Sequence, residues 1–369
     1  MITKPKSTVA RVSSVALNRQ ISPLDIGIHI NKTVLPQIAV NYGAVRSHST
    51  TMGSPSKILA WRDIETSKGV FDWTNIDQWV AAHEALGHYM VCDILTPPDW
   101  AVTASAVGGS AWGGKSNLPP TNNQDVIDFV TAFVTRFTGR VHAYDGWNEP
   151  NLVQKYYVGT AGRLAEIQRI FYQTVKAIDP AAIVLSPEFT SVFTGITGGT
   201  SGQVGLREFL AASDGAGGTG AQWFDVCAYH FYCNDSALRP SALWRMYSGV
   251  KTELTTSGRG SVDIWATETG VIVPNFTTLT TDVRNSLLRL HMYTLFALGC
   301  KKVFWFSVDE TFIGFMTDTI PVWNTTYYEL ISAPSKNGYV DIINLDTSMA
   351  AYLDGFGYAQ FDGMQTFVA

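Results

Sequence analysis

Strand-like and helix-like segments alternate eight times along the sequence, and this alternation limits the fold more than any other feature. The strand-like segments are short and apolar, as expected of strands that are buried on both faces. They cover residues 24–30, 44–49, 89–95, 141–147, 182–186, 224–230, 262–267 and 302–307. Alternation of this kind is typical of a parallel sheet covered by helices. We therefore predict an α/β fold, a single-domain (β/α)8 barrel.

The segments between the strands carry apolar residues at helical spacing. The clearest covers residues 125–138, where six apolar side chains share one face: Val126, Phe129, Val130, Phe133, Val134 and Phe137. Further helices are predicted at 31–41, 74–86, 161–178, 206–212, 243–255, 282–298 and, from a weaker pattern, 348–356. Each predicted strand is therefore followed by a predicted helix.

The composition suits one large domain. The chain has 369 residues, of which 46% are hydrophobic, and this is enough for the core of a single barrel. We expect an N-terminal extension at residues 1–20 and the barrel at residues 21–369. The net charge is −5 with only 26 Lys and Arg residues, so a nucleic-acid partner is not expected. No apolar run is long enough to span a membrane.

The N-terminus and the cysteines say little about the compartment. The first 20 residues lack an uninterrupted apolar stretch, so they do not resemble a secretory signal. The localisation stays unknown, because a secreted or cell-surface protein would need a signal that has been removed. The four cysteines lie in or beside apolar strand-like runs without metal-ligand spacing, and we expect buried free thiols: Cys92, Cys227, Cys233 and Cys300.

The fourth predicted strand ends in Trp147-Asn148-Glu149-Pro150. Proline cannot donate a ladder hydrogen bond, so the strand must end there. An amide and a carboxylate are thus held at the carboxyl end of a strand, where parallel α/β folds keep their chemistry. Glu149 could instead cap the following helix, but the residues around it are a poor match to a capping signature.

This segment resembles the acid/base segment of the retaining glycoside hydrolases built on (β/α)8 barrels, the enzymes of clan A. The likeness is strongest to glycoside hydrolase family 39, which holds β-xylosidases, α-L-iduronidases and bacterial exopolysaccharide hydrolases. Such a resemblance requires a second carboxylate near the end of the seventh strand. The sequence has Glu268 there, within Ala266-Thr-Glu-Thr-Gly270.

The resemblance implies hydrolysis of β-type O-glycosidic bonds in a poly- or oligosaccharide by double displacement. Glu149 would be the acid/base and Glu268 the nucleophile, without a cofactor and without a metal. Retention requires the two carboxyl groups to stand about 5 to 5.5 Å apart. The ends of the fourth and seventh strands face each other across a barrel mouth, which allows this spacing.

The same resemblance suggests neighbours for the nucleophile. Arg46, at the end of the second strand, matches the arginine that related enzymes place beside it. Tyr232 or Tyr229, near the end of the sixth strand, could donate a hydrogen bond to the same carboxylate. His230 lies between these two tyrosines in the sequence and is a further candidate for substrate contact.

Other residues are candidates for sugar contacts. Asn148 matches the asparagine that binds the 2-hydroxyl of the reacting sugar, and Trp305 matches the tryptophan beneath that sugar, although a core position explains Trp305 equally well. Trp100 could wall the cleft, and His48 could contact sugar or bond within its own strand. Glu188 lies near the end of the fifth strand, where helix capping or solvation explains it.

Two alternatives remain open from the sequence. One is a cellulase- or mannanase-like member of the same clan, with the same two acids and different sugar contacts. The other is a carbohydrate-binding barrel that has lost its activity, although Glu149, Glu268 and Asn148 are all present. Long glycine-rich loops favour an open cleft and a polysaccharide substrate, but the sequence does not identify the sugar.

Overall fold

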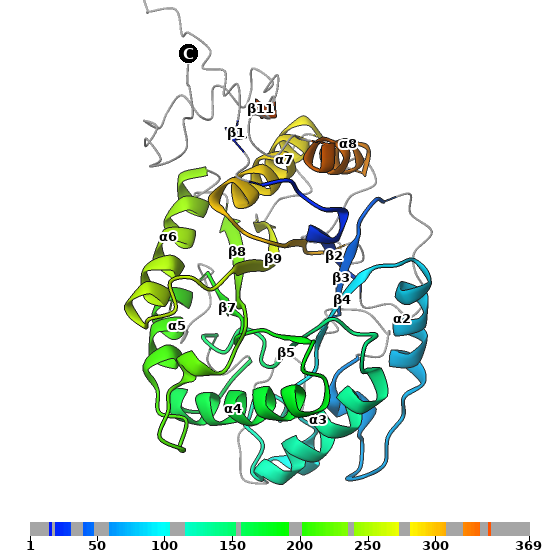
Figure 1. Cartoon of the computed structure of the whole chain (residues 1–369), viewed down its shortest axis with the longest axis vertical. Helices are drawn as coiled ribbons and strands as arrows, with labels where there is room; N and C mark the ends of the chain where they lie inside the picture. The colour runs from blue at the N-terminus through cyan, green and yellow to red at the C-terminus, as the bar shows by residue number, and fades with distance from the viewer. Residues whose placement is uncertain are drawn as a thin grey trace, which may run out of the picture.

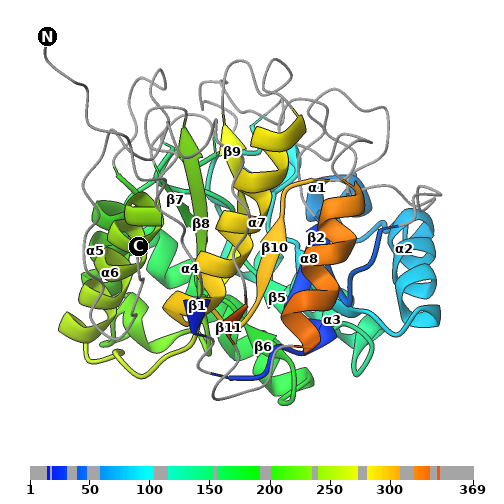
Figure 2. The same ribbon diagram turned by 90° about the horizontal axis from the view of Figure 1, so that it is seen from above.

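The computed structural model describes most of the barrel. It covers residues 15–16, 19–30, 40–47, 59–103, 115–152, 156–191, 201–234, 240–272, 281–307, 320–332 and 339–340. Strands form an inner ring, and helices cover it from outside (Figure 1). The arrows of β8 and β9 point to the same end of the ring (Figure 2). The predicted (β/α)8 architecture is confirmed.

All neighbouring strands of the barrel pair in parallel. Their order around the sheet is β6-β5-β4-β3-β2-β10-β9-β8-β7. The strands are β2 (Ile26–His29), β3 (Ala44–Ser47), β4 (Tyr89–Asp93), β5 (Ala143–Asp145), β6 (Ile183–Val184), β7 (Phe189–Thr190), β8 (Cys227–Asn234), β9 (Ile264–Ile272) and β10 (Val303–Trp305). Because β6 and β7 belong to one interrupted segment, the ring closes with eight barrel strands.

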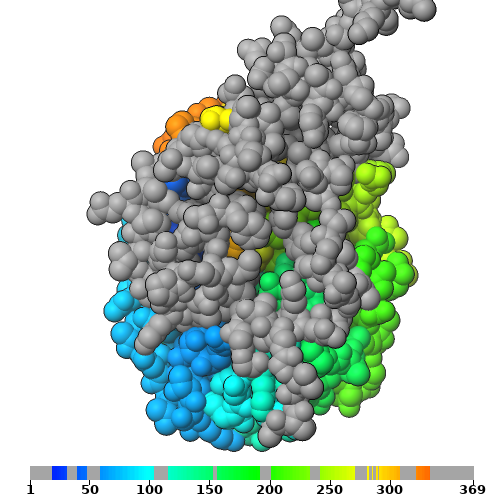
Figure 3. Space-filling view, turned by 180° about the vertical axis from the view of Figure 1, so that it is seen from behind, coloured from blue at the N-terminus to red at the C-terminus, as the bar shows by residue number. Residues whose placement is uncertain are grey.

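Helices run outside the strands. They are α1 (Trp61–Ile64), α2 (Thr74–Ala85), α3 (Asn123–Phe137), α4 (Ala161–Ile178), α5 (Gly202–Ala211), α6 (Pro240–Thr256), α7 (Thr281–Leu298) and α8 (Ile320–Ser332), with 3₁₀ turns at Pro23–Asp25, Asp99–Ala101 and Gly220–Gln222. The colours of the chain run in order from blue through green around the edge of the molecule (Figure 3), as expected if α2 to α6 follow one another in chain order. Helices that are adjacent in sequence therefore cover adjacent parts of the sheet.

Helix α8 was not predicted. Its sequence begins with Ile320 and Pro321 and is rich in β-branched and aromatic residues, which lower helix propensity. The predicted helix at 348–356 and most of the one predicted at 31–41 lie outside the described residues. At the edge of the barrel, β1 (Val15–Ala16) pairs antiparallel with β11 (Tyr339–Val340), so the expected N-terminal extension touches the chain after α8.

Two apolar clusters position the strands. The smaller fills the interior of the barrel and contains Ala44, Val91, Ala143, Leu185, Val226, Ala228, Trp265 and Phe304. The larger lies between the strands and the helices, and the six apolar side chains predicted on α3 are all buried in it. Truncating a buried Phe typically costs about 3 to 5 kcal/mol, so α3 is a major support of the ring.

Two further expectations concern the thiols and membranes. Cys92, Cys227 and Cys300 are buried free thiols, as predicted, and burial raises the pKa of the Cys227 thiol to about 12. The side chain of Cys233 lies outside the described residues. Within the helices that the structure describes, none is long and apolar enough to cross a membrane.

Candidate active site

The backbone turns sharply where the fourth strand ends. Asn148 forms a parallel bridge with Glu188, so pairing between the fourth and fifth strands continues beyond β5. Glu149 then takes a positive φ of 45°, a left-handed conformation uncommon for residues with a side chain. Its N–H donates to the carbonyl of Glu188 at 2.8 Å, and its own carbonyl accepts from Leu152 at 3.0 Å. These bonds hold Glu149 in the turn.

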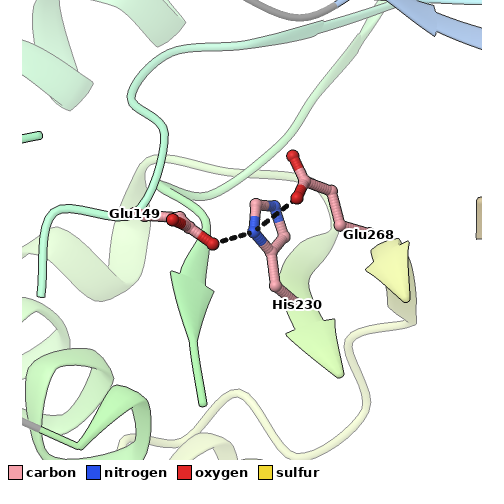
Figure 4. Close-up of side chains that lie close together, drawn as sticks. All are labelled: Glu149, His230 and Glu268. Atoms are coloured by element: carbon pink, nitrogen blue, oxygen red, sulfur yellow. Dashed lines mark hydrogen bonds and ion pairs between the residues drawn. The ribbon is translucent and has the colours of Figure 1, made fainter. Parts of the chain in front are cut away.

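The two predicted acids lie on either side of one histidine, as Figure 4 shows. His230 Nδ1 is 2.8 Å from Glu149 Oε1 and 3.4 Å from Glu268 Oε2. One oxygen of each carboxylate and one ring nitrogen of His230 all lie within 4.8 Å of one another. Glu268 lies inside β9 rather than beyond the seventh strand, because that strand is longer than predicted. The fold thus brings together residues 119 positions apart.

Arg46 joins the acids of several strands. Its Nη1 donates to Glu268 at 2.7 Å and its Nε to Asp145 at 2.8 Å, while its Nη2 contacts Glu188 and lies 3.9 Å from Asp93. Burial alone would lower the pKa of this guanidinium, but the four carboxylates outweigh burial and hold it well above its usual value. A permanent positive charge therefore touches Glu268.

Tyr232 is the second donor to Glu268. Its hydroxyl donates to Glu268 Oε2 at 2.6 Å. Burial, and then the charge of Glu268, raise the Tyr232 pKa well above its usual value, so the hydroxyl keeps its proton. Tyr229, the alternative from the sequence, packs its ring against Phe231 at 4.9 Å in the apolar core. The bonds from Arg46 and Tyr232 favour the ionised form of Glu268.

The surroundings of His230 favour its protonated form. Its burial would lower its pKa, but the charges of Glu268 and Glu188 and the hydrogen bond to Glu149 raise the pKa to about 10. Glu149, His230 and Glu268 have the ligand types and spacing of a metal site. A protonated ring nitrogen donates a hydrogen bond, whereas a metal ligand must be unprotonated.

Asn148 is buried beside this cluster. Its Oδ1 accepts from Arg46 Nη2 at 3.3 Å, which orients the amide. Its Nδ2 is also buried, and no partner for it lies among the residues that the structure describes. The Nδ2–H group of Asn148 can therefore donate a hydrogen bond to a sugar hydroxyl.

Trp305 occupies the core position that the sequence left open. It lies in the apolar core, with its ring edge-on to His291 of α7. Successive residues of a strand face opposite sides, so the next residue, Phe306, faces the cluster. The ring of Phe306 lies 5.1 Å from His29 and 6.4 Å from Tyr232.

Trp100, a further candidate, contacts residues of the segment between β3 and α2. Trp100 donates its indole N–H to the carbonyl of Glu65 at 2.8 Å, and its ring is edge-on to Trp61 at 5.9 Å. It therefore anchors that segment. His48 lies outside the described residues.

The structure adds three acids that sequence reasoning did not assign to the site. Asp93, Asp145 and Glu188 are all buried, and all three approach Arg46. Glu188 is neither a helix cap nor solvated. Each of the three acids lies near the end of a predicted strand, and this position was a signal in the sequence. The sequence does not show, however, which strand ends are buried.

Replacing Arg46 with Met should destabilise the protein strongly. The change leaves several buried carboxylates without their cation, and breaking such a pair costs about 3 to 5 kcal/mol. Urea unfolding measures this loss. The matched control is Arg136→Met, which removes an exposed pair with Asp77 and should cost less than about 1 kcal/mol. Equal losses in the two variants would contradict the assigned role of Arg46.

The sequence and the fold were both compared with those of known proteins. No protein-family model and no curated protein matches the sequence. Among solved structures, a monomeric β-xylosidase from Caulobacter crescentus superposes with a TM-score of 0.62 at 18% identity, covering 90% of this chain and 74% of that one. The fold is that of barrel glycoside hydrolases.

Two further structures agree with this assignment of the fold. A glucosidase from Croceicoccus marinus has a TM-score of 0.60 at 12% identity, covering 87% of this chain and 70% of that one. A family 39 glycoside hydrolase from Bacteroides cellulosilyticus has a TM-score of 0.54 at 18% identity, covering 86% of this chain and 66% of that one. At these identities the likeness establishes the barrel, while the chemistry depends on the site itself.

Proposed function

We propose that this protein is a retaining glycoside hydrolase that cleaves β-type O-glycosidic bonds in a poly- or oligosaccharide. The observation that carries the proposal is the pairing of Glu149 and Glu268, whose nearest oxygens lie within 4.8 Å across His230. Retaining enzymes hold their carboxyl groups about 5 to 5.5 Å apart, whereas inverting enzymes need roughly 6.5 to 9.5 Å to admit a water. The spacing supports retention.

The environments of the two acids support distinct roles. Glu268 accepts hydrogen bonds from Arg46 and Tyr232, which stabilise the ionised carboxylate that a nucleophile needs. Glu149 accepts from His230 and follows Asn148 at the turn. In the first step a Glu268 oxygen bonds to the anomeric carbon while Glu149 gives its proton to the leaving oxygen. In the second step Glu149 takes a proton from water, and the resulting hydroxide displaces Glu268.

A panel of substrates tests the proposal. It should begin with aryl β-xylosides and xylan, since one similar structure is a β-xylosidase, and continue with aryl β-glucosides, cellulose and mannan. Release of reducing sugar, with the β-anomer appearing first by NMR, is the expected result. Activity on cellulose or mannan alone would favour the alternative of a cellulase- or mannanase-like enzyme of the same clan. Binding without release on every substrate would favour an inactive carbohydrate-binding barrel.

Asn148→Ala should reduce turnover more than substrate binding. A contact to the 2-hydroxyl strengthens as charge develops at the anomeric carbon, so its loss should raise the barrier by roughly 2 to 4 kcal/mol. Steady-state kinetics on one aryl glycoside separates kcat from KM. An unchanged kcat with a raised KM would make Asn148 an ordinary binding residue.

A further inference from the structure

Glu188 is a buried carboxylate that the proposed reaction does not use. It lies in the gap between β6 and β7 and is fully shielded from solvent. Its backbone is paired on both sides of the acid turn: its N–H donates to Trp147 at 2.9 Å, and its carbonyl accepts from Glu149 at 2.8 Å. Its side chain points to two cations, because Oε2 contacts Arg46 Nη2 and lies 3.5 Å from His230 Nε2.

These two cations are the ones that touch the reacting carboxylates. Arg46 binds Glu268, and His230 binds Glu149. We propose that Glu188 is a positioning residue, the common counter-ion of Arg46 and His230, which keeps the His230 ring doubly protonated between the two acids. Its importance for turnover rests on the proposed function, whereas the charge state of His230 does not.

The geometry around the imidazole supports this assignment. Its Nδ1 faces Glu149 at 2.8 Å and Glu268 at 3.4 Å, and its Nε2 faces Glu188 at 3.5 Å. A neutral imidazole has one donor and one acceptor nitrogen, so one of its lone pairs would point at a carboxylate. The imidazolium ion carries a proton on each nitrogen and a charge that suits carboxylates on both sides of the ring, with Glu149 at 2.8 Å from Nδ1 and Glu188 at the ion-pair distance of 3.5 Å from Nε2.

The other charged or titratable groups near the ring have different roles. Tyr232 on β8 lies edge-on to the ring at 6.3 Å and keeps its proton, and Arg46 on β3 opposes the charge on His230. Asp145 on β5 has its pKa raised to about 7, first by burial and also by Glu188, although Arg46 lowers it.

An imidazolium ion between the acids has two effects on them. Its charge stabilises whichever of the two acids is ionised, Glu268 before the first step of the proposed reaction and Glu149 before the second. Its Nδ1–H also holds Glu149 in one orientation at the turn. Loss of the Glu188 charge would weaken both effects without removing any group that contacts the substrate.

The variant Glu188→Gln isolates this role, because it keeps the size of the side chain and both backbone hydrogen bonds. The protein is labelled with ¹⁵N-histidine, and the two ring nitrogens of His230 are followed by NMR as the pH rises. A counter-ion at this distance shifts a pKa by about 1 to 3 units. The His230 transition in Glu188→Gln should therefore fall by about that amount relative to the unmodified protein.

Glu253→Gln is the matched control. Glu253 is also buried and also binds an arginine, Arg207, but it belongs to the helix layer. Its variant should leave the His230 transition where it is. The alkaline limb of the kcat profile in Glu188→Gln should move to lower pH with the His230 transition, while KM changes little.

Two results would overturn the proposal. One is a His230 transition that is the same in folded Glu188→Gln and in the unmodified protein. The other is an unprotonated ring nitrogen in the unmodified protein at pH 8, which needs no variant and applies even if Glu188→Gln fails to fold. Both readouts are independent of glycosidase activity, so they distinguish failure of this proposal from failure of the proposed function.

Discussion

Glu268→Gln should lower kcat by roughly ten-thousandfold or more, the scale seen when a catalytic nucleophile is removed. The amide has nearly the same shape and still meets Arg46 and Tyr232, so the fold should be kept. It carries no negative charge, however, and cannot form the ester with the anomeric carbon. Initial rates on an aryl β-glycoside measure the loss, and Glu253→Gln, in the helix layer, is the control for removal of a buried acid.

A trapping experiment tests the same role directly. A 2-fluoro glycoside with a good leaving group should form the ester and then hydrolyse slowly, because the fluorine destabilises the charge that develops in both steps. Peptide mapping should find the added sugar mass on the peptide that contains Glu268. A label on another carboxylate would refute the assignment. An inverted product without any label would mean that the two acids activate water instead.

Glu149→Gln should lower kcat by about 10²- to 10⁴-fold on glycosides with poor leaving groups, the usual contribution of a general acid or base. Substrates with good leaving groups need no proton in the first step, so their first step should be nearly normal. Their second step still needs the base, and the glycosyl-enzyme should accumulate as an initial burst of released phenol.

Stopped-flow measurement of that burst is the decisive readout for Glu149. A small anion such as azide needs no general base and should restore turnover on the activated substrate, with a glycosyl azide as product. Equal losses on activated and natural glycosides, with neither burst nor rescue, would show that Glu149 is not the acid/base.

The barrel could be predicted because its signals are local. The strands are short apolar runs, and helices such as α3 and α4 have clear periodicity and defined ends. Helix α8 lacked such a signal, because its β-branched and aromatic residues suit a strand as well as a helix. Its position depends on packing against α7 and on bonds such as the one from Trp323 to Asn41, which the sequence does not reveal.

The sequence motifs of the candidate site could be predicted, but the burial of its residues could not. Glu149 and Glu268 belong to recognisable segments at strand ends, and the structure brings them together. The sequence left two positions open for Trp305, because a shift of one residue along a strand reverses the face that its side chain occupies. Glu188 was attributed to helix capping or solvation because its burial depends on the interruption between β6 and β7, a three-dimensional feature with no local signature.

The contacts of Arg46 have a consequence for chimeric proteins in which half-barrels are exchanged. This one side chain, from the second strand, reaches acids on or beside the third, fourth, fifth and seventh strands. Two of these acids, Asp93 and Asp145, belong to the same half of the chain as Arg46, and two, Glu188 and Glu268, belong to the other. Half-barrels exchanged between related proteins would therefore each carry an incomplete set of charges. A chimera should assemble only when the incoming half supplies acids at the positions of Glu188 and Glu268, even if every apolar contact between the halves is matched.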